Sequence, residues 1–201
     1  MRFLSQFLAA ASDPAHFPAP TLPEVAFLGR SNVGKSSVIN ALVGSKIART
    51  SSTPGRTRAI NFFGIRRAGE ANNELILADL PGYGYAKLSR EESSTWAGFV
   101  DPYLAERPTL VLCIALVDAN VPPQASDARL IEFLQTAGRP FLIVATKTDR
   151  LSGNKLPTAL RQMSQTYHGA RVIPFSAHTG AGRDALWREV LQALPAAQSK
   201  A

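Results

Sequence analysis

Gly29-Arg30-Ser31-Asn32-Val33-Gly34-Lys35-Ser36 is the most informative stretch of the chain. It fits the pattern G-x-x-x-x-G-K-[ST], a loop whose backbone N–H groups surround nucleotide phosphates while the lysine reaches the β and γ oxygens. From average residue usage we estimate that the pattern arises by chance in roughly one chain in a hundred of this length. An ordinary glycine turn is therefore disfavoured, and the sequence predicts that a nucleoside triphosphate binds here.

The residues on either side of this loop have the order that a phosphate-binding loop requires. Val25 to Leu28 is a short apolar run typical of a buried strand. Ser37 to Leu42 has apolar residues at helical spacing and is followed by Gly44, a residue common just past a helix end. The helix would aim its free N–H groups and partial positive charge at the phosphates.

Length and composition predict one globular domain with short tails. The 201 residues suffice for one substantial core. We expect an N-terminal extension over 1–21, the domain over 22–195 and a C-terminal tail over 196–201. Met1 to Ala11 resembles a secretory signal only mildly, because Ser5 and Gln6 interrupt its apolar run, and is interpreted as a helical extension. No apolar stretch approaches the ~18 residues of a membrane span.

The charge distribution indicates which kind of partner the chain could bind, and the cysteine content indicates the redox state of its compartment. The chain has 22 basic and 15 acidic residues, a net charge of +7, and no Asp or Glu from Ser45 to Gly69. That segment either binds a polyanion or is a solvated basic loop; its basic residues are Lys46, Arg49, Arg56, Arg58, Arg66 and Arg67. The single cysteine, Cys113, excludes an internal disulfide, and its apolar neighbours indicate a buried thiol in a reducing compartment.

Apolar runs alternate with helix-like segments along the chain, which predicts an α/β fold with a mostly parallel sheet and helices on both faces. Six strands are expected, at 25–28, 60–65, 74–78, 110–117, 141–145 and 172–175. The connection from Arg66 to Asn73 is too short for a crossover helix, so 60–65 and 74–78 should form an antiparallel hairpin. Further helices are expected at 90–105, 125–137, 156–167 and 183–194.

The third expected strand runs into Asp79-Leu80-Pro81-Gly82, a D-x-x-G tetrapeptide. Such a carboxylate can hold Mg²⁺ through water, and the glycine N–H can meet a γ-phosphate. Alone the tetrapeptide is weak, since a turn residue is an ordinary role for Asp79. Mg²⁺ would take one hydroxyl from Ser36 and a second from Thr53 or Thr57.

Two later strands also end in candidate binding residues. Thr146-Lys147-Thr148-Asp149 fits the base-recognition pattern N/T-K-x-D, in which an aspartate accepts two hydrogen bonds from guanine but finds no such paired donors on adenine. The stem of Lys147 can lie over the purine. Phe175-Ser176-Ala177 would present a backbone N–H to the guanine oxygen. A helix cap at Asp149 and a loop hydroxyl at Ser176 are the structural alternatives.

Together these elements resemble a TRAFAC-class P-loop GTPase, and more narrowly the EngB family of bacterial ribosome-biogenesis GTP-binding proteins. The resemblance implies a fold with a single GTPase (G) domain. The resemblance covers about 22–194. Three stretches carry it: Gly29 to Ser37, then Thr53-Pro54-Gly55-Arg56-Thr57 leading into Ile60-Asn61-Phe62-Phe63, and Asp79-Leu80-Pro81-Gly82-Tyr83-Gly84-Tyr85-Ala86.

The resemblance implies GTP binding, slow hydrolysis to GDP and phosphate, assembly of the large ribosomal subunit or its precursor through rRNA and ribosomal protein, and normal septation in dividing cells. It also implies a cytoplasmic protein, expected as a monomer, with Ser36 and Thr57 as Mg²⁺ ligands. Lys35, Thr57 and Gly82 would act in catalysis, and the first switch would be Gly55-Arg56-Thr57-Arg58-Ala59. Thr146 stands where most such proteins have asparagine, although its hydroxyl can still tie the base loop to the phosphate loop.

Tyr83 follows Gly82 where many GTPases keep a water-orienting glutamine. We therefore expect slow turnover, on the order of 10⁻⁴ to 10⁻² s⁻¹. Asn32 would hold K⁺, or alternatively brace the loop. The basic segment moves with the switch and is expected to contact rRNA in the GTP state only.

Two other functions compete with this one. The first is a GTP-gated scaffold for division proteins with incidental hydrolysis. The second is a small-molecule phosphotransferase on the same fold, against which the base-reading Asp149 argues.

Overall fold

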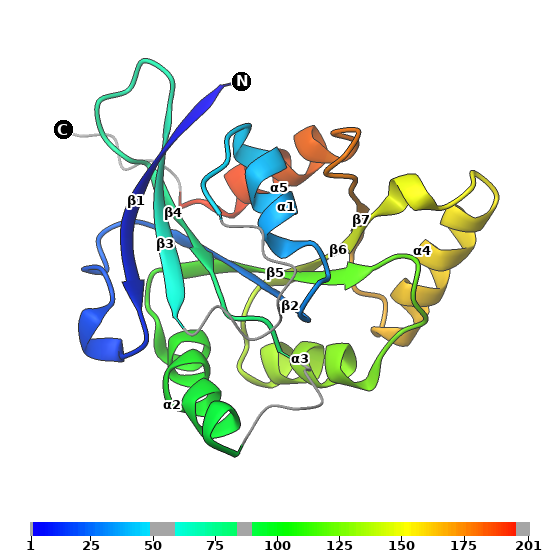
Figure 1. The fold of residues 1–201 in the computed structure, drawn as a ribbon, viewed down its shortest axis with the longest axis horizontal. Coiled ribbons are helices and arrows are strands. Elements are labelled where there is room, and N and C mark those ends of the chain that lie inside the picture. The colour runs from blue at the N-terminus through cyan, green and yellow to red at the C-terminus, as the bar shows by residue number, and fades with distance from the viewer. Residues whose placement is uncertain (1, 49–58, 84–89, 196–201) are drawn as a thin grey trace.

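The protein is described from a computed structural model that covers residues 2–48, 59–83 and 90–195, with 90–97 as backbone only. Within this part of the chain, seven strands form one sheet in the order β1-β3-β4-β2-β5-β6-β7 (Figure 1). Their bounds are β1 Phe3–Ala11, β2 Glu24–Gly29, β3 Ile60–Arg67, β4 Leu75–Asp79, β5 Leu110–Asp118, β6 Phe141–Thr146 and β7 Val172–Pro174.

The sheet is mostly parallel, as predicted, and β3 runs against its neighbours. β4, β2, β5, β6 and β7 pair in parallel. β3 pairs antiparallel with β4, which confirms the predicted hairpin, and antiparallel with β1 on its other side. The parallel strands therefore end at one edge of the sheet, where ligands of such folds bind.

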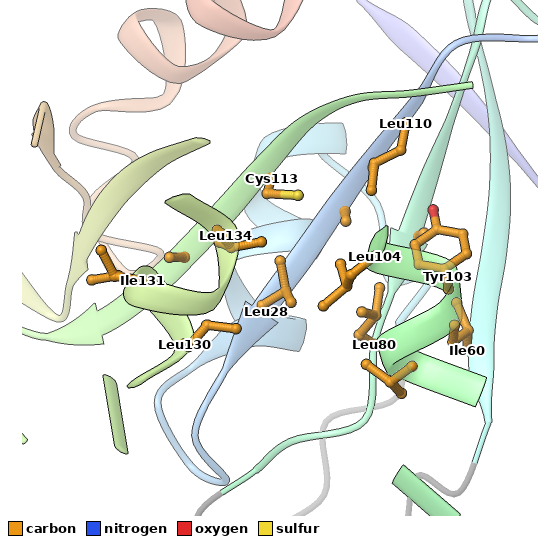
Figure 2. Packing of buried hydrophobic residues seen from close by; sticks show 14 of the residues in the cluster. Leu28, Ile60, Leu80, Tyr103, Leu104, Leu110, Cys113, Leu130, Ile131 and Leu134 are labelled. Atoms are coloured by element: carbon orange, nitrogen blue, oxygen red, sulfur yellow. The ribbon is translucent and has the colours of Figure 1, made fainter. Parts of the chain in front are cut away.

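Helices cover both faces of the sheet (Figure 1). α1 and α5 pack into one core cluster, whereas α2, α3 and α4 contribute to the other. Figure 2 shows the second cluster, in which Leu104 of α2 and Leu130 of α3 lie around Leu28 of β2. The bounds are α1 Lys35–Val43, α2 Arg90–Glu106, α3 Ala125–Thr136, α4 Lys155–Thr166 and α5 Arg183–Ala193, with 3-10 turns at Pro14–His16 and Thr148–Arg150.

The prediction of a helical N-terminal extension was wrong, because Phe3–Ala11 is a strand that adds a seventh member to the six-stranded sheet expected. Phe3 and Phe7 are four residues apart, a spacing that suits one face of a helix and also one face of a strand. Pairing with β3 decides between them. Phe3 then stacks on Trp187 of α5, with ring centroids 3.8 Å apart.

The core holds aromatic side chains of β3, α2 and α5, together with the cysteine that the sequence predicts to be buried. Phe62, Phe63, Phe99 and Trp187 are buried. Cys113 is buried on β5, and burial raises the pKa of its thiol to about 12, so it is an unreactive packing residue.

The basic segment is only partly described. Arg67 of this segment pairs with Glu74 through a 2.8 Å contact, which offsets its charge. Lys46 and Arg66 are also described, whereas Arg49, Arg56 and Arg58 lie outside the described residues. No described helix is long and apolar enough to cross a membrane.

Candidate functional site

The predicted phosphate loop connects the end of β2 to the start of α1. Gly34 precedes the first helical residue with φ 101°, a left-handed conformation that glycine adopts without steric cost. Gly34, the N-cap residue, has no side chain that could cap the helix, so among the described residues the first helical amides are left for an anion. The loop therefore has the strand–loop–helix geometry that its sequence predicts.

Lys35 and Asp79 meet at the base of this loop. The lysine Nζ donates a hydrogen bond to Asp79 Oδ1, and both side chains are buried. The structure thus brings together the lysine of the phosphate loop and the carboxylate of the D-x-x-G stretch. Gly82 lies against the same loop, since a Cβ at this position would approach Ser31 Oγ at 3.0 Å.

Thr146, at the end of β6, ties the base-recognition segment to the phosphate loop. Its Oγ1 donates to the Val33 carbonyl at 2.7 Å, with a longer contact of 3.3 Å to the Val117 carbonyl. The predicted role of this hydroxyl is confirmed. Lys147 adds a second tie, because its Nζ donates to the Asn32 carbonyl at 2.8 Å.

Asp118, at the end of β5, is a site residue that the sequence reasoning missed. Its Oδ2 accepts a 2.7 Å hydrogen bond from Lys147 Nζ, and its Oδ1 accepts two from Asn120. Burial opposes ionisation of Asp118, but the hydrogen bonds from Lys147 and Asn120 prevail and lower its pKa. The available signal was position, since Asp118 ends a parallel strand like the other site residues.

Asp149 lies exposed beside the loop after β7. Ser176 Oγ donates to Asp149 Oδ1 at 2.6 Å, and Ser176 Oγ accepts from the Thr179 amide at 3.1 Å. This fixes the direction of the serine hydroxyl, and its hydrogen bond lowers the pKa of Asp149. The hydrogen bond from Ser176 therefore orients one oxygen of the Asp149 carboxylate.

The amides of Phe175-Ser176-Ala177 are not equivalent. Phe175 N donates to Ala145 O at 2.8 Å, and Ser176 N donates to Ala181 O at 3.0 Å. Among the described residues nothing accepts from Ala177 N, so this amide is the one able to meet a ligand.

A cleft of about 1470 Å³ joins these elements. Its lining includes Gly34, Asp79, Thr146, Lys147, Asp149 and Ala177. Ala59 also lines it, whereas Gly55, Arg56, Thr57 and Arg58 of the expected first switch, and Thr53, lie outside the described residues. Arg30 of the phosphate loop contacts Asp127 of α3, and Ser36 and Thr148 lie within segments that border the cleft.

Residues 24–147 match the family described as "50S ribosome-binding GTPase". The "Probable GTP-binding protein EngB" of Koribacter versatilis is 54% identical over 96% of this chain and 95% of its own length. The chain belongs to the EngB family of GTP-binding proteins. Its EngB relative in Acidobacterium capsulatum is 55% identical over 94% of this chain and 90% of its own.

One solved structure extends the comparison to the EngB fold. The "Crystal structure of a probable GTP-binding protein engB" superposes with a TM-score of 0.68, 21% identity, and coverage of 85% of this chain and 97% of that one. The single G-domain fold that the resemblance implies is thereby confirmed.

Proposed function

We propose that this EngB-family protein binds Mg²⁺-GTP in the cleft and hydrolyses it slowly to GDP and phosphate. The observation that carries the proposal is the convergence of β2, β4, β6 and β7 on one cleft, with Thr146 and Lys147 bonded to the phosphate loop. Those bonds fix the spacing between the phosphate end and the base end, which a nucleotide must span.

The phosphate end is formed by Gly29 to Ser36. Loop amides and the N-terminus of α1 supply donors for the β-phosphate, and Lys35 supplies a positive charge. Gly82, which lies against Ser31, would offer its amide to the γ-phosphate. These groups favour the negative charge that develops during phosphoryl transfer.

The donor set suits Mg²⁺ rather than a metal held by protein alone. Asp79 supplies a buried carboxylate beside Lys35, and Ser36 is the second residue of α1. Mg²⁺ commonly takes one or two protein oxygens, with waters and phosphates filling the other positions. Ser36, Thr57 and, through water, Asp79 would hold it. When bound, it would neutralise charge on the phosphate oxygens.

The base end is formed by Thr146-Lys147-Thr148-Asp149 and Phe175-Ser176-Ala177. Asp149, oriented by Ser176, accepts from the two guanine donors, and the Ala177 amide donates to the guanine oxygen. Because Asp149 is an acceptor at both positions, guanine is selected over adenine.

Hydrolysis is expected to be slow, on the order of 10⁻⁴ to 10⁻² s⁻¹, because Tyr83 replaces the water-orienting glutamine. Asn32 could contribute by holding K⁺ near the phosphates. Equal hydrolysis rates in Na⁺ and K⁺ buffers would remove this cation from the mechanism.

The cellular role that we propose is nucleotide-switched assembly of the large ribosomal subunit in the cytoplasm, and this role would be needed for normal septation. The protein would act as a monomer whose one domain includes β1 as well as residues 22–195. The description of the matched family names the 50S ribosome, and the chain carries a net charge of +7, which favours binding to RNA.

Two experiments test these statements. In calorimetry GTP should bind and ATP should not; binding of ATP alone would refute the base assignment. In sedimentation with large-subunit precursors, the wild type should co-sediment with GTP, and Lys35→Ala should not. Association with septal proteins but not with ribosome precursors would instead support the GTP-gated scaffold.

A further inference from the structure

A buried carboxylate outside the cleft connects the phosphate loop to the residue after Gly82. Asp127 lies in the first turn of α3 and is 1% exposed. Arg30 Nε donates to both carboxylate oxygens, at 3.1 and 3.2 Å. The Tyr83 hydroxyl donates to Asp127 Oδ1 at 3.1 Å. One side chain thus bonds two segments that are far apart in the sequence.

The backbone of Tyr83 is held by the same phosphate loop. Ser31 N donates to Tyr83 O at 3.1 Å, and Tyr83 N donates to Gly29 O at 3.4 Å. Tyr83 is therefore attached through its main chain to the loop and through its hydroxyl to α3. Since Gly82 is its neighbour and abuts Ser31, these bonds also fix the position of the Gly82 amide.

Both partners of Asp127 offset the cost of burying its carboxylate. A buried carboxylate is costly unless hydrogen bonds and an opposite charge compensate it. Arg30 supplies the charge, the Tyr83 hydroxyl supplies a further donor, and the helix N-terminus favours the anion. Undocking Tyr83 would therefore remove one hydrogen bond from a carboxylate that water scarcely reaches.

We propose that Asp127 is a positioning residue for the nucleotide switch: by holding Tyr83 against the phosphate loop, it keeps the Gly82 amide where a γ-phosphate would be bound. The inference rests on the proposed binding and hydrolysis of GTP. GDP has no γ-phosphate, so the loss of this positioning should weaken binding of the triphosphate and leave GDP binding nearly unchanged.

The test compares the full-length wild type with Tyr83→Phe, Asp127→Ala and the double variant. Affinities for GDP and for a non-hydrolysable GTP analogue are measured by calorimetry, with Mg²⁺ present. Each single variant should raise the ratio of the GTP-analogue Kd to the GDP Kd about tenfold, which is the effect of one hydrogen bond to a charged group. The double variant should show little further loss beyond that of Asp127→Ala, because Asp127→Ala already removes the acceptor of the Tyr83 hydroxyl.

Glu132→Ala is the matched control, because Glu132 is an exposed carboxylate on the same helix. It should leave the Kd ratio unchanged. Urea unfolding of every variant distinguishes a positioning role from a structural one. A purely structural role would lower the free energy of unfolding and weaken the binding of GDP and of the GTP analogue equally. That result, or an unchanged ratio, would overturn the proposal. If the wild type itself failed to bind GTP, the proposed function would fail instead.

Discussion

Replacing Glu24 by glutamine should destabilise the protein severely, because Glu24 is the fully buried centre of a charged network at the start of β2. Its Oε1 accepts from Arg107 Nη2 at 2.6 Å, Arg107 Nε at 2.9 Å and Thr109 Oγ1 at 2.8 Å, and its Oε2 accepts from Tyr103 at 2.8 Å. Arg107 is itself 9% exposed. Removing the carboxylate charge leaves the guanidinium buried without its partner.

The expected cost is about 3–5 kcal/mol, the range for breaking a buried ion pair by removing one member. A single domain is stable by about 5–15 kcal/mol, so a large part of the total is at stake. Arg107 keeps its bond to the Pro18 carbonyl and its position over the Phe17 ring, which places the loss near the lower end of that range.

Urea unfolding followed by circular dichroism measures the effect, with Arg107→Met and the double variant completing a cycle. Once Glu24 is neutral, removing the arginine charge should cost little, so the double variant should be about as stable as Glu24→Gln alone. A single-variant loss below about 1 kcal/mol, or additive losses in the double variant, would refute the reasoning, because contacting partners are expected to be non-additive.

Four further predictions concern the cleft. Thr146→Val should lower the free energy of unfolding by about 1–3 kcal/mol, because the hydrogen bond from the hydroxyl to the Val33 carbonyl is lost. It should also weaken GTP binding. Urea unfolding and calorimetry measure the two effects, and unchanged values would show that this hydrogen bond is dispensable. Asp149→Asn should shift preference from guanine to xanthine nucleotides in competition binding, and retained GTP affinity would mean that the base pocket lies elsewhere. Ser36→Asn should weaken Mg²⁺-dependent GTP binding more than GDP binding, and an equal effect on both would remove Ser36 from the metal site. Asp118 has a lowered pKa in the folded protein, so its ionised form contributes stability above its unfolded pKa of about 3.9, and this contribution is lost as pH falls through the folded pKa. Asp118→Asn should therefore flatten the plot of unfolding free energy against pH in that acidic range. Parallel plots for the variant and the wild type would contradict this.

The parallel strands and the elements at their ends were predictable from the sequence because each carries a local signal. Strands are apolar runs, and the phosphate and base segments follow them directly, as at Gly29 and Thr146. Their location at one edge of the sheet follows from the parallel topology, because the carboxyl ends of parallel strands lie at the same edge. The predicted and observed elements therefore agree closely around the cleft.

What the sequence did not reveal depends on contacts between distant residues. The spacing of Phe3 and Phe7 suits a helix or a strand, and only pairing with β3 decides. Asp127 is an ordinary helix residue until Arg30, 97 positions earlier, bonds to it. Glu24 and Arg107 likewise meet across 83 positions. No local pattern encodes such partners.

The stacking of Phe3 on Trp187 makes one indole a natural optical reporter. Trp187 Nε1 also donates to the Leu42 carbonyl near the end of α1, so this residue of α5 contacts both β1 and the helix that follows the phosphate loop. Dissociation of β1 from β3 would expose the Trp187 ring to solvent and change its fluorescence. Detachment of the N-terminal strand could therefore be followed in the native protein without any attached dye.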